Sequence, residues 1–301
     1  MRTSTHSAAL KAMQGLHASL LRVLDNARPV TTGKRVELPS DDPVSAARIT
    51  SLKSQIAREA GFRKAAAEGR ERLSLAASAL GAGSNALRSA QTAALRGLNS
   101  ATLGQRERDI LAEEVDQALA ATLGLANTRA QGRSLFSGFQ TSTDAFGTTV
   151  AAGRVSAVAY QGDGGTGAVQ VGEAVQVRSN LPGDRVWDRP GASALASLIR
   201  VRDALLAGDE AALRGGLAEL ESAQAVLSTA HADAGALMRS MEDRENALEA
   251  SSLELTALLS AHEDADLALS ATRYQQALGA YEAGLLASAK VLELPSLMRY
   301  L

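Results

Sequence analysis

The residues best suited to chemistry in this 301-residue chain lie in a short polar stretch, TTGKRVELPSDDPVSAARI, at residues 31–49. Its Gly-Lys-Arg run could hold a phosphate group, and its acidic pair could bind a metal ion. A Walker phosphate-binding loop needs an earlier glycine at a fixed spacing and a Ser or Thr after the lysine. Here Pro29 and Val30 precede the run and Arg35 follows Lys34. The stretch therefore does not match a phosphate-binding loop.

A joint between two helices explains the same stretch better. Asp42 followed by Pro43 is typical of a helix start, because the carboxylate accepts a free backbone N–H and proline lacks an N–H that the first turn cannot use. Gly33 permits a left-handed turn. We predict that this structural loop and cap comprise Gly33, Lys34, Arg35, Pro39, Ser40, Asp41, Asp42 and Pro43.

Two further clusters could do chemistry, and each also has a structural explanation. HEDAD, at residues 262–266, could bind a metal, but acidic residues also favour a helix N-terminus. GDGGTG, at residues 162–167, could bind phosphate, but no lysine or helix start follows it, so we predict a hairpin turn. No G-x-S-x-G motif occurs. We therefore predict no catalytic residues, no cofactor, no metal and no enzyme activity.

Composition excludes several classes of function. Cysteine is absent, so disulfides and thiolate chemistry are excluded. The net charge of −2 argues against a dedicated nucleic-acid or membrane-surface binder. Hydrophobic residues make up 46% of the chain and aromatics only 3%, which suits close contacts between helices. The N-terminal residues form no continuous apolar segment, so we predict neither a cleavable signal peptide nor a membrane span.

Hydrophobic periodicity predicts a mainly helical protein. Apolar residues spaced by seven from Leu213 to Leu255, mostly leucines, indicate one long helix, and the register fails at HEDAD, as at a stutter or hinge. Residues 136–190 are instead rich in Gly, Thr and Val. We expect helices over about 5–27, 43–100, 105–130, 209–261 and 264–293, and strands over 155–160, 168–171 and 175–178.

The two ends of the chain should pair. Residues 1–72 carry 13 Lys and Arg against 7 Asp and Glu, whereas residues 191–301 carry 8 against 16. Each end also has an apolar stripe, which includes His17 as a packed or interface residue. The stripes proposed for assembly are Leu10, Met13, Leu20 and Leu24 at one end and Tyr274, Leu278, Tyr281, Leu285 and Leu292 at the other.

These patterns predict an elongated helical bundle or coiled coil, built from paired N- and C-terminal segments, with a small β-rich insertion. We expect three domains. Residues 1–40 with 264–301 would form a terminal assembly domain. Residues 41–135 with 191–263 would form a helical rod, and residues 136–190 would form the insertion.

The loop at 31–49 resembles the loop between the first two helices of flagellin-like proteins, and its Lys-Arg and Pro-Ser-Asp-Asp-Pro form resembles the hook-associated protein 3 branch. Three further segments are similar to that branch: LANTRAQGRSLFSGFQTSTDAF at 125–146, YQGDGG at 160–165 and residues 262–301. The resemblance covers nearly the whole chain. Pro29 departs from it, because it suggests an early end or a kink in the first helix.

The resemblance implies a structural subunit at the hook–filament junction of the bacterial flagellum, and its alternative is flagellin, the filament subunit. It also implies secretion through the flagellar type III apparatus, assembly as a ring with another hook-associated protein and flagellin, and an export chaperone that binds the C-terminal region. A third possibility, a secreted enzyme on a helical scaffold, would need a convergent polar pocket in the β-rich part.

Overall fold

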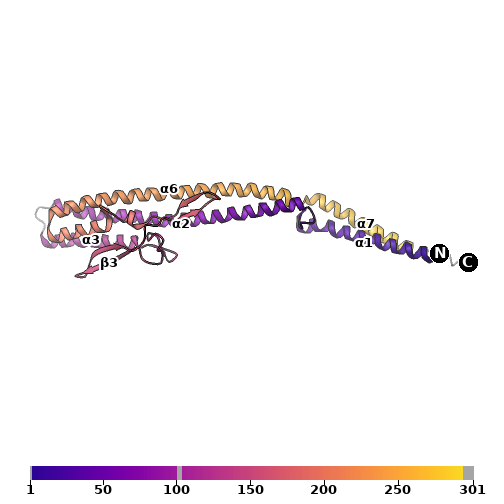
Figure 1. Ribbon diagram of the computed structural model, residues 1–301, viewed down its shortest axis with the longest axis horizontal. Coiled ribbons are helices and arrows are strands. Elements are labelled where there is room, and N and C mark those ends of the chain that lie inside the picture. Colours follow the sequence, from indigo (N-terminus) through magenta and orange to yellow (C-terminus); the bar gives the residue numbers. More distant parts are fainter. Residues whose placement is uncertain (1, 100–103, 294–301) are drawn as a thin grey trace. The chain divides into compact units, whose positions relative to one another are not determined.

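The computed structural model describes the backbone of residues 2–99 and 104–293, and within these ranges all side chains except those of residues 2–6, 8–9 and 291–293. Seven helices lie in this described part (Figure 1). They are α1 (Arg2–Thr32), α2 (Pro43–Asn99), α3 (Gln105–Ala126), α4 (Gly183–Val186), α5 (Ala194–Ala207), α6 (Glu210–Glu263) and α7 (Leu267–Glu293).

The strands pair as four antiparallel hairpins, β1 with β2, β3 with β4, β5 with β6 and β7 with β8. They are β1 (Arg129–Ala130), β2 (Arg133–Ser134), β3 (Phe146–Ala151), β4 (Arg154–Tyr160), β5 (Ala168–Gln170), β6 (Gln176–Arg178), β7 (Asp188–Arg189) and β8 (Ala192–Ser193). Among the described residues the protein is therefore mainly α with a few small sheets, as the sequence predicts.

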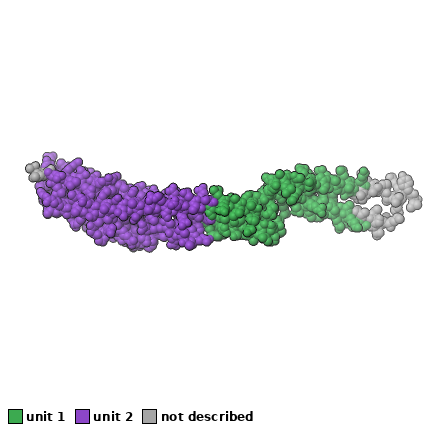
Figure 2. Space-filling model, turned by 90° about the horizontal axis from the view of Figure 1, so that it is seen from above, with its two compact units in different colours: residues 1–58, 251–301 green, residues 59–250 purple. Residues whose placement is uncertain are grey.

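The chain forms two compact units (Figure 2). The first comprises residues 1–58 and 251–301, and the second comprises residues 59–250. The hairpins belong to the second unit together with α3 and α5. The division into three domains stays a prediction.

The second unit is organised by two antiparallel heptad stripes on α2 and α6. Contacts such as Arg70 with Glu245 and Ser84 with Gln224 show the antiparallel direction. A repeat of seven keeps buried residues on one helix face, where they pack against the partner helix. The members of these stripes are buried: Ala66, Leu73, Leu80, Leu87 and Ala94 on α2, and Leu213, Leu220, Leu227, Ala234 and Met241 on α6.

The polar residues next to the α6 stripe also face α2. Gln224 Nε2 donates to Ser84 Oγ at 2.5 Å, and His231 Nδ1 lies 3.0 Å from the carbonyl oxygen of Ala77. Glu245 accepts from Arg70 Nε at 3.1 Å. These polar positions therefore do not interrupt the seam, because each finds a partner on the neighbouring helix.

Trp187 anchors the hairpin region to the helices. Its ring is fully buried and meets Phe136 edge-on, with 5.6 Å between ring centroids. Gly83 of α2 makes room for it, since a β-carbon there would lie 2.5 Å from the indole ring. This close approach explains a glycine that helix propensity alone would mark as a weak point.

One prediction about this region is wrong. The GDGGTG segment is no hairpin turn: it joins two separate hairpins, β3–β4 and β5–β6, and Asp163 holds it by accepting from Phe139 N and Gly165 N. The turn of the β3–β4 hairpin lies at Ala152-Gly153, where both residues have a positive φ. Strand β3 and helix α5 have no counterpart among the predicted elements.

In the first unit, α1 and α7 lie side by side (Figure 1). The helix predicted over 5–27 extends to Thr32, so Pro29 does not end it. Proline removes one backbone N–H donor close to the end of the helix, where few turns remain to be disrupted. The hydroxyls of Thr31 and Thr32 also donate to the carbonyl of Arg28, which satisfies an acceptor of the last turn.

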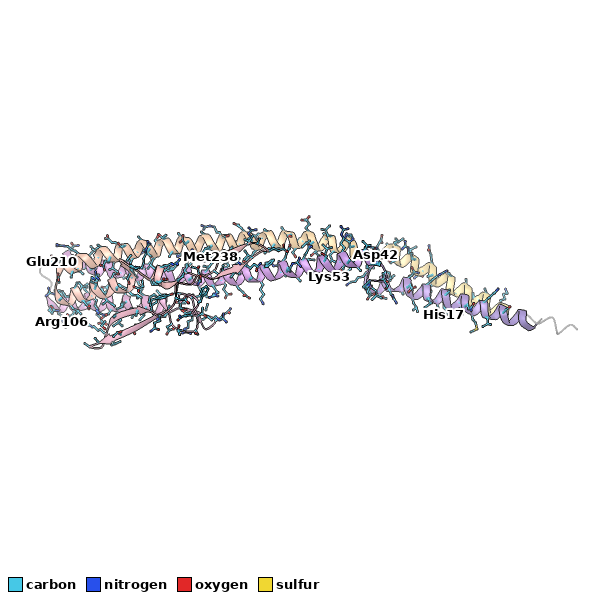
Figure 3. All side chains as sticks on the ribbon, viewed as in Figure 1. His17, Asp42, Lys53, Arg106, Glu210 and Met238 are labelled. Carbon is cyan, nitrogen blue, oxygen red and sulfur yellow. The ribbon has the colours of Figure 1, made fainter. Side chains whose placement is uncertain are left out.

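The contact between α1 and α7 uses a different face of α1 from the proposed stripe. Val23 is buried, and Leu16 lies beside Gly284, with its Cδ1 3.9 Å from where a β-carbon would stand. His17 is exposed (Figure 3). The stripe residues Leu10, Met13, Leu20 and Leu24 are 47%, 68%, 36% and 53% exposed.

On α7 the proposed stripe is closer to the contact. Tyr274, Leu278 and Tyr281 are half-buried, whereas Leu285 is 42% exposed. The side chain of Leu292 lies outside the described residues. The expectation that one stripe on each helix makes the contact is therefore wrong for α1, whose stripe leaves an apolar face uncovered.

Candidate functional site

The loop after α1 is held against the break between α6 and α7 by backbone hydrogen bonds. Arg35 N donates to the carbonyl of Glu263 at 2.7 Å, and Ala265 N donates to the carbonyl of Gly33 at 2.9 Å. Lys34 and Asp264 form an antiparallel β-bridge between them. We call this contact, residues 33–36 with residues 262–265, the joint.

Gly33 sets the geometry of the joint. It has φ +71°, a left-handed conformation that residues with a β-carbon adopt only at a cost, and its N–H bonds the carbonyl of Pro29. Glycine here ends α1 and turns the chain toward residue 264. Val36 follows and is 4% exposed, so the joint also has an apolar anchor.

A buried carboxylate lies at the centre of the joint. Glu263 Oε1 lies 2.6 Å from Lys34 Nζ and 2.9 Å from Lys53 Nζ, and the Glu263 side chain is only 8% exposed. The hydrogen bond from Lys34, followed by that from Lys53, lowers the pKa of Glu263 below its ordinary value. The same contact raises the pKa of Lys34. One carboxylate thus ties the loop and the start of α2 to the end of α6.

The start of α2 has the predicted cap (Figure 3). Asp42 Oδ1 accepts from Val44 N at 3.1 Å and from Ser45 N at 3.0 Å, while Oδ2 accepts from Ser45 Oγ at 2.6 Å. The hydroxyl of Ser45 is the main reason that the pKa of Asp42 is lowered. Arg35 connects this cap to the joint, because its Nη1 lies 3.7 Å from Asp42 and its Nη2 donates to the carbonyl of His262.

Pro39, Ser40 and Asp41 form the turn between the joint and the cap. Asp41 N bonds the carbonyl of Leu38, with Pro39 at the position where its fixed φ suits such a turn. The Asp41 carboxylate accepts from Leu38 N and Glu37 N, and these bonds lower its pKa. The acidic pair therefore binds backbone N–H groups, Asp41 those of the loop and Asp42 those of the first turn of α2.

The HEDAD residues have separate roles. Asp266 Oδ1 accepts from Leu269 N at 3.0 Å and so caps α7, while Asp264 Oδ2 accepts from Ser260 Oγ. The Glu263 carboxylate instead forms ion pairs with Lys34 and Lys53. No group of three or more His, Cys, Asp or Glu side chains that could hold a metal occurs within the described ranges.

Sequence reasoning missed the roles of Glu263 and Lys53. They lie 210 residues apart, and although Glu263 belongs to HEDAD, no local motif marks Lys53 as its partner. A usable signal was the position of Glu263 at the break in heptad register. A buried acidic residue there needs a basic partner, and the loop Gly33-Lys34-Arg35 carries two cations.

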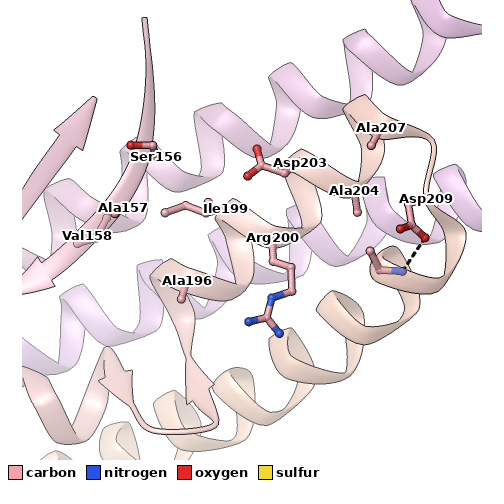
Figure 4. Close-up of a pocket in the computed structure, with 11 residues that line it drawn as sticks. Ser156, Ala157, Val158, Ala196, Ile199, Arg200, Asp203, Ala204, Ala207 and Asp209 are labelled. Carbon is pink, nitrogen blue, oxygen red and sulfur yellow. Dashed lines mark hydrogen bonds between the residues drawn. The ribbon is translucent and has the colours of Figure 1, made fainter. Parts of the chain in front are cut away.

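A pocket of about 520 Å³ lies between β4, α5 and the start of α6 (Figure 4). Arg200 and Asp203 leave α5 on different sides, and Asp209 caps α6 by accepting from Ala212 N. Its polar groups do not converge on one point, as an active site would require.

No helix within residues 2–99 and 104–293 is both long and apolar enough to cross a membrane.

Comparison with known proteins agrees with this arrangement. The family model of the bacterial flagellin N-terminal helical region matches residues 3–141. Flagellar hook-associated protein 3 of Escherichia coli K12 is 26% identical over 230 residues, which cover 75% of this chain and 72% of the relative.

Solved structures show the same fold. Xanthomonas campestris FlgL matches with a TM-score of 0.61 at 16% identity, over 69% of this chain and 99% of that chain. The flagellar junction protein FlgL of Legionella pneumophila matches with a TM-score of 0.59 at 16% identity, over 72% of this chain and all of that chain.

The chain has paired terminal helices, a loop that closes on the break between α6 and α7, and small hairpins carried by long helices, and its fold is of the flagellin-like helical class. Within that class, the chain resembles flagellar hook-associated protein 3 in sequence and FlgL structures in fold.

Proposed function

We propose that this chain is a structural subunit of the bacterial flagellum that joins the hook to the filament. The observation that carries the proposal is the joint, where the loop at 33–36 closes on residues 262–265 beside the paired terminal helices. Two proteins similar to this chain in sequence are named flagellar hook-associated protein 3. The function is mechanical, so no enzyme activity and no cofactor are part of the proposal.

The second candidate is flagellin, the filament subunit. The match to the flagellin N-terminal helical region favours it. The Lys-Arg and Pro-Ser-Asp-Asp-Pro form of the loop and the LFSGF sequence favour the junction subunit instead.

Assembly would use the terminal helices, residues 1–40 with 264–301. The exposed face of α1 that carries Met13 and Leu24 is apolar and uncovered by α7. Burial of such surface is the main favourable term in most protein association. We propose that this face packs against neighbouring copies in a ring and against the adjoining hook-associated protein and flagellin. Export to the cell exterior would use the flagellar type III apparatus and a chaperone at the C-terminal region.

Deletion of the gene in the bacterium that encodes this chain separates the two candidates. A junction subunit predicts hooks without attached filaments and flagellin shed into the medium, as seen by electron microscopy and blotting. Normal attached filaments in the deletion strain would refute the junction role. Absence of the filament polymer itself, from cells and medium alike, would favour flagellin.

Complementation of the deletion strain tests the assembly face. The double variant Met13→Ser, Leu24→Ser should export normally and keep a wild-type helical content, because both side chains are exposed in the single chain. It should fail to restore attached filaments. The control is Arg22→Ser, another exposed residue of α1, which should restore them. Full motility with the double variant would exclude this face from assembly.

A further inference from the structure

A small pocket in the second unit gathers positive charge. Its volume is about 150 Å³, and it lies where β6, α4 and β7 meet α6. Arg178, Arg185 and Arg189 line it together with one carboxylate, Asp233. Apolar side chains, including Val226 of α6, complete the wall. Three cations and one anion leave this pocket with an excess of positive charge.

The three arginines have no anionic partner within the described ranges. None of them forms an ion pair there, and the Nε of Arg178 is buried without a hydrogen-bond partner. A buried donor without an acceptor is costly, and nearly all such groups in folded proteins are satisfied by protein, water or a bound group. Elsewhere in the same unit the buried Arg202 is paired with Asp116 and Asp203.

The chemistry of the pocket selects its ligand. The planar guanidinium offers several N–H donors in a fork that matches carboxylate and phosphate oxygens. A volume of about 150 Å³ corresponds to roughly five water molecules at ~30 Å³ each. That space fits one oxyanion head but not a nucleotide.

We propose that Arg178, Arg185 and Arg189 form a binding site for a single oxyanion, either a carboxylate or a phosphate group. The site belongs to the second unit and shares no residue with the joint, so it does not depend on the proposed junction role. Two sources could supply the oxyanion: a free inorganic anion, or an acidic side chain of another protein chain.

Isothermal titration calorimetry on the full chain in low-salt buffer tests the proposal. The two probes are inorganic phosphate and N-acetylglutamate amide, which imitates a protein glutamate. We expect at least one probe to bind with one-to-one stoichiometry. Arg185→Gln should raise its Kd at least tenfold, and because Arg185 is exposed this variant should fold normally. Arg178→Lys, which keeps the charge but loses the fork, should also weaken binding.

Arg106→Gln is the matched control, because Arg106 is an exposed arginine of α3 outside the pocket. Its Kd should equal that of the wild type. Binding of phosphate alone assigns the site to a free anion, whereas binding of the glutamate analogue assigns it to an acidic side chain. Absence of binding by both probes, or an equal loss in Arg106→Gln, would overturn the proposal.

Discussion

Replacing Glu263 with glutamine should loosen the joint without unfolding the protein. Glutamine has the same shape but no charge, so the contacts at 2.6 Å and 2.9 Å to Lys34 and Lys53 lose their ionic character. Removing one member of a fully buried pair costs about 3–5 kcal/mol, because the other charge stays desolvated. Here the lysine side chains are 44% and 50% exposed and can regain water. Two partly exposed ion pairs, at up to ~1 kcal/mol each, correspond to a loss of about 1–2 kcal/mol in the stability of the joint.

Hydrogen exchange measures this loss where it should occur. The amides of Arg35 and Ala265 donate across the joint, so they report its opening. A loss of about 1–2 kcal/mol corresponds to exchange faster by a factor of roughly 5–30. Amides in the core of α2 near Leu80 should exchange at the wild-type rate.

Glu282→Gln is the control, because Glu282 is an exposed carboxylate of α7 that lies away from the joint. It should leave the exchange of both amides unchanged. If Glu263→Gln left their protection intact, or if Glu282→Gln reduced it equally, the ion pairs would not hold the joint.

Three further outcomes follow from the same loop. Folding lowers the pKa of Glu263 from 4.5, so the charged carboxylate stabilises the protein fully above pH 4.5, and this stabilisation is lost as the pH falls through the lower pKa of the folded state. The urea midpoint should therefore drop more steeply on acidification in the wild type than in Glu263→Gln. Asp42→Ala should lower the urea midpoint by removing acceptors for Val44 N and Ser45 N, and Asp42→Ser should recover most of it, whereas equal loss in both would argue against capping. Gly33→Ala should lower the free energy of unfolding, measured with urea, by about 1–2 kcal/mol because Gly33 has a positive φ. The control Gly61→Ala, in the interior of α2 with open space around it, should raise that free energy by up to ~1 kcal/mol. If Gly33→Ala has no effect, the left-handed turn is not required.

Local signals explain what the sequence predicted well. Asp42-Pro43 starts α2 because a cap depends only on neighbouring residues, and the structure begins α2 at Pro43. The apolar residues spaced by seven on α6 are buried from Leu213 to Met241, since a heptad repeat keeps one face toward its partner. The break at HEDAD appears between α6 and α7, where the register of the repeat fails.

The errors come from choices that local pattern does not decide. Apolar residues surround much of α1, with Leu20, Leu21 and Leu24 close together, so periodicity alone does not identify the face that meets α7. The glycines of GDGGTG are compatible with a hairpin turn and equally with a loop held by Asp163. Only the pairing of β4 with β3 shows that it is a loop. The contact of Glu263 with Lys53 joins positions 210 residues apart, which no short motif encodes.

The joint also has a consequence for the order in which the chain can fold. Arg35 and His262 are separated by 227 residues, so the contact between them closes a loop that contains most of the protein. The entropy of closing a loop rises only slowly with its length, but contacts of such high sequence separation form late and slow the folding rate. A chain delivered with its N-terminus first has α1, Gly33 and Lys34 in place long before Glu263 arrives. The joint can therefore form only when nearly the whole polypeptide is present. A chain truncated before residue 262 would lack α7, the partner of α1.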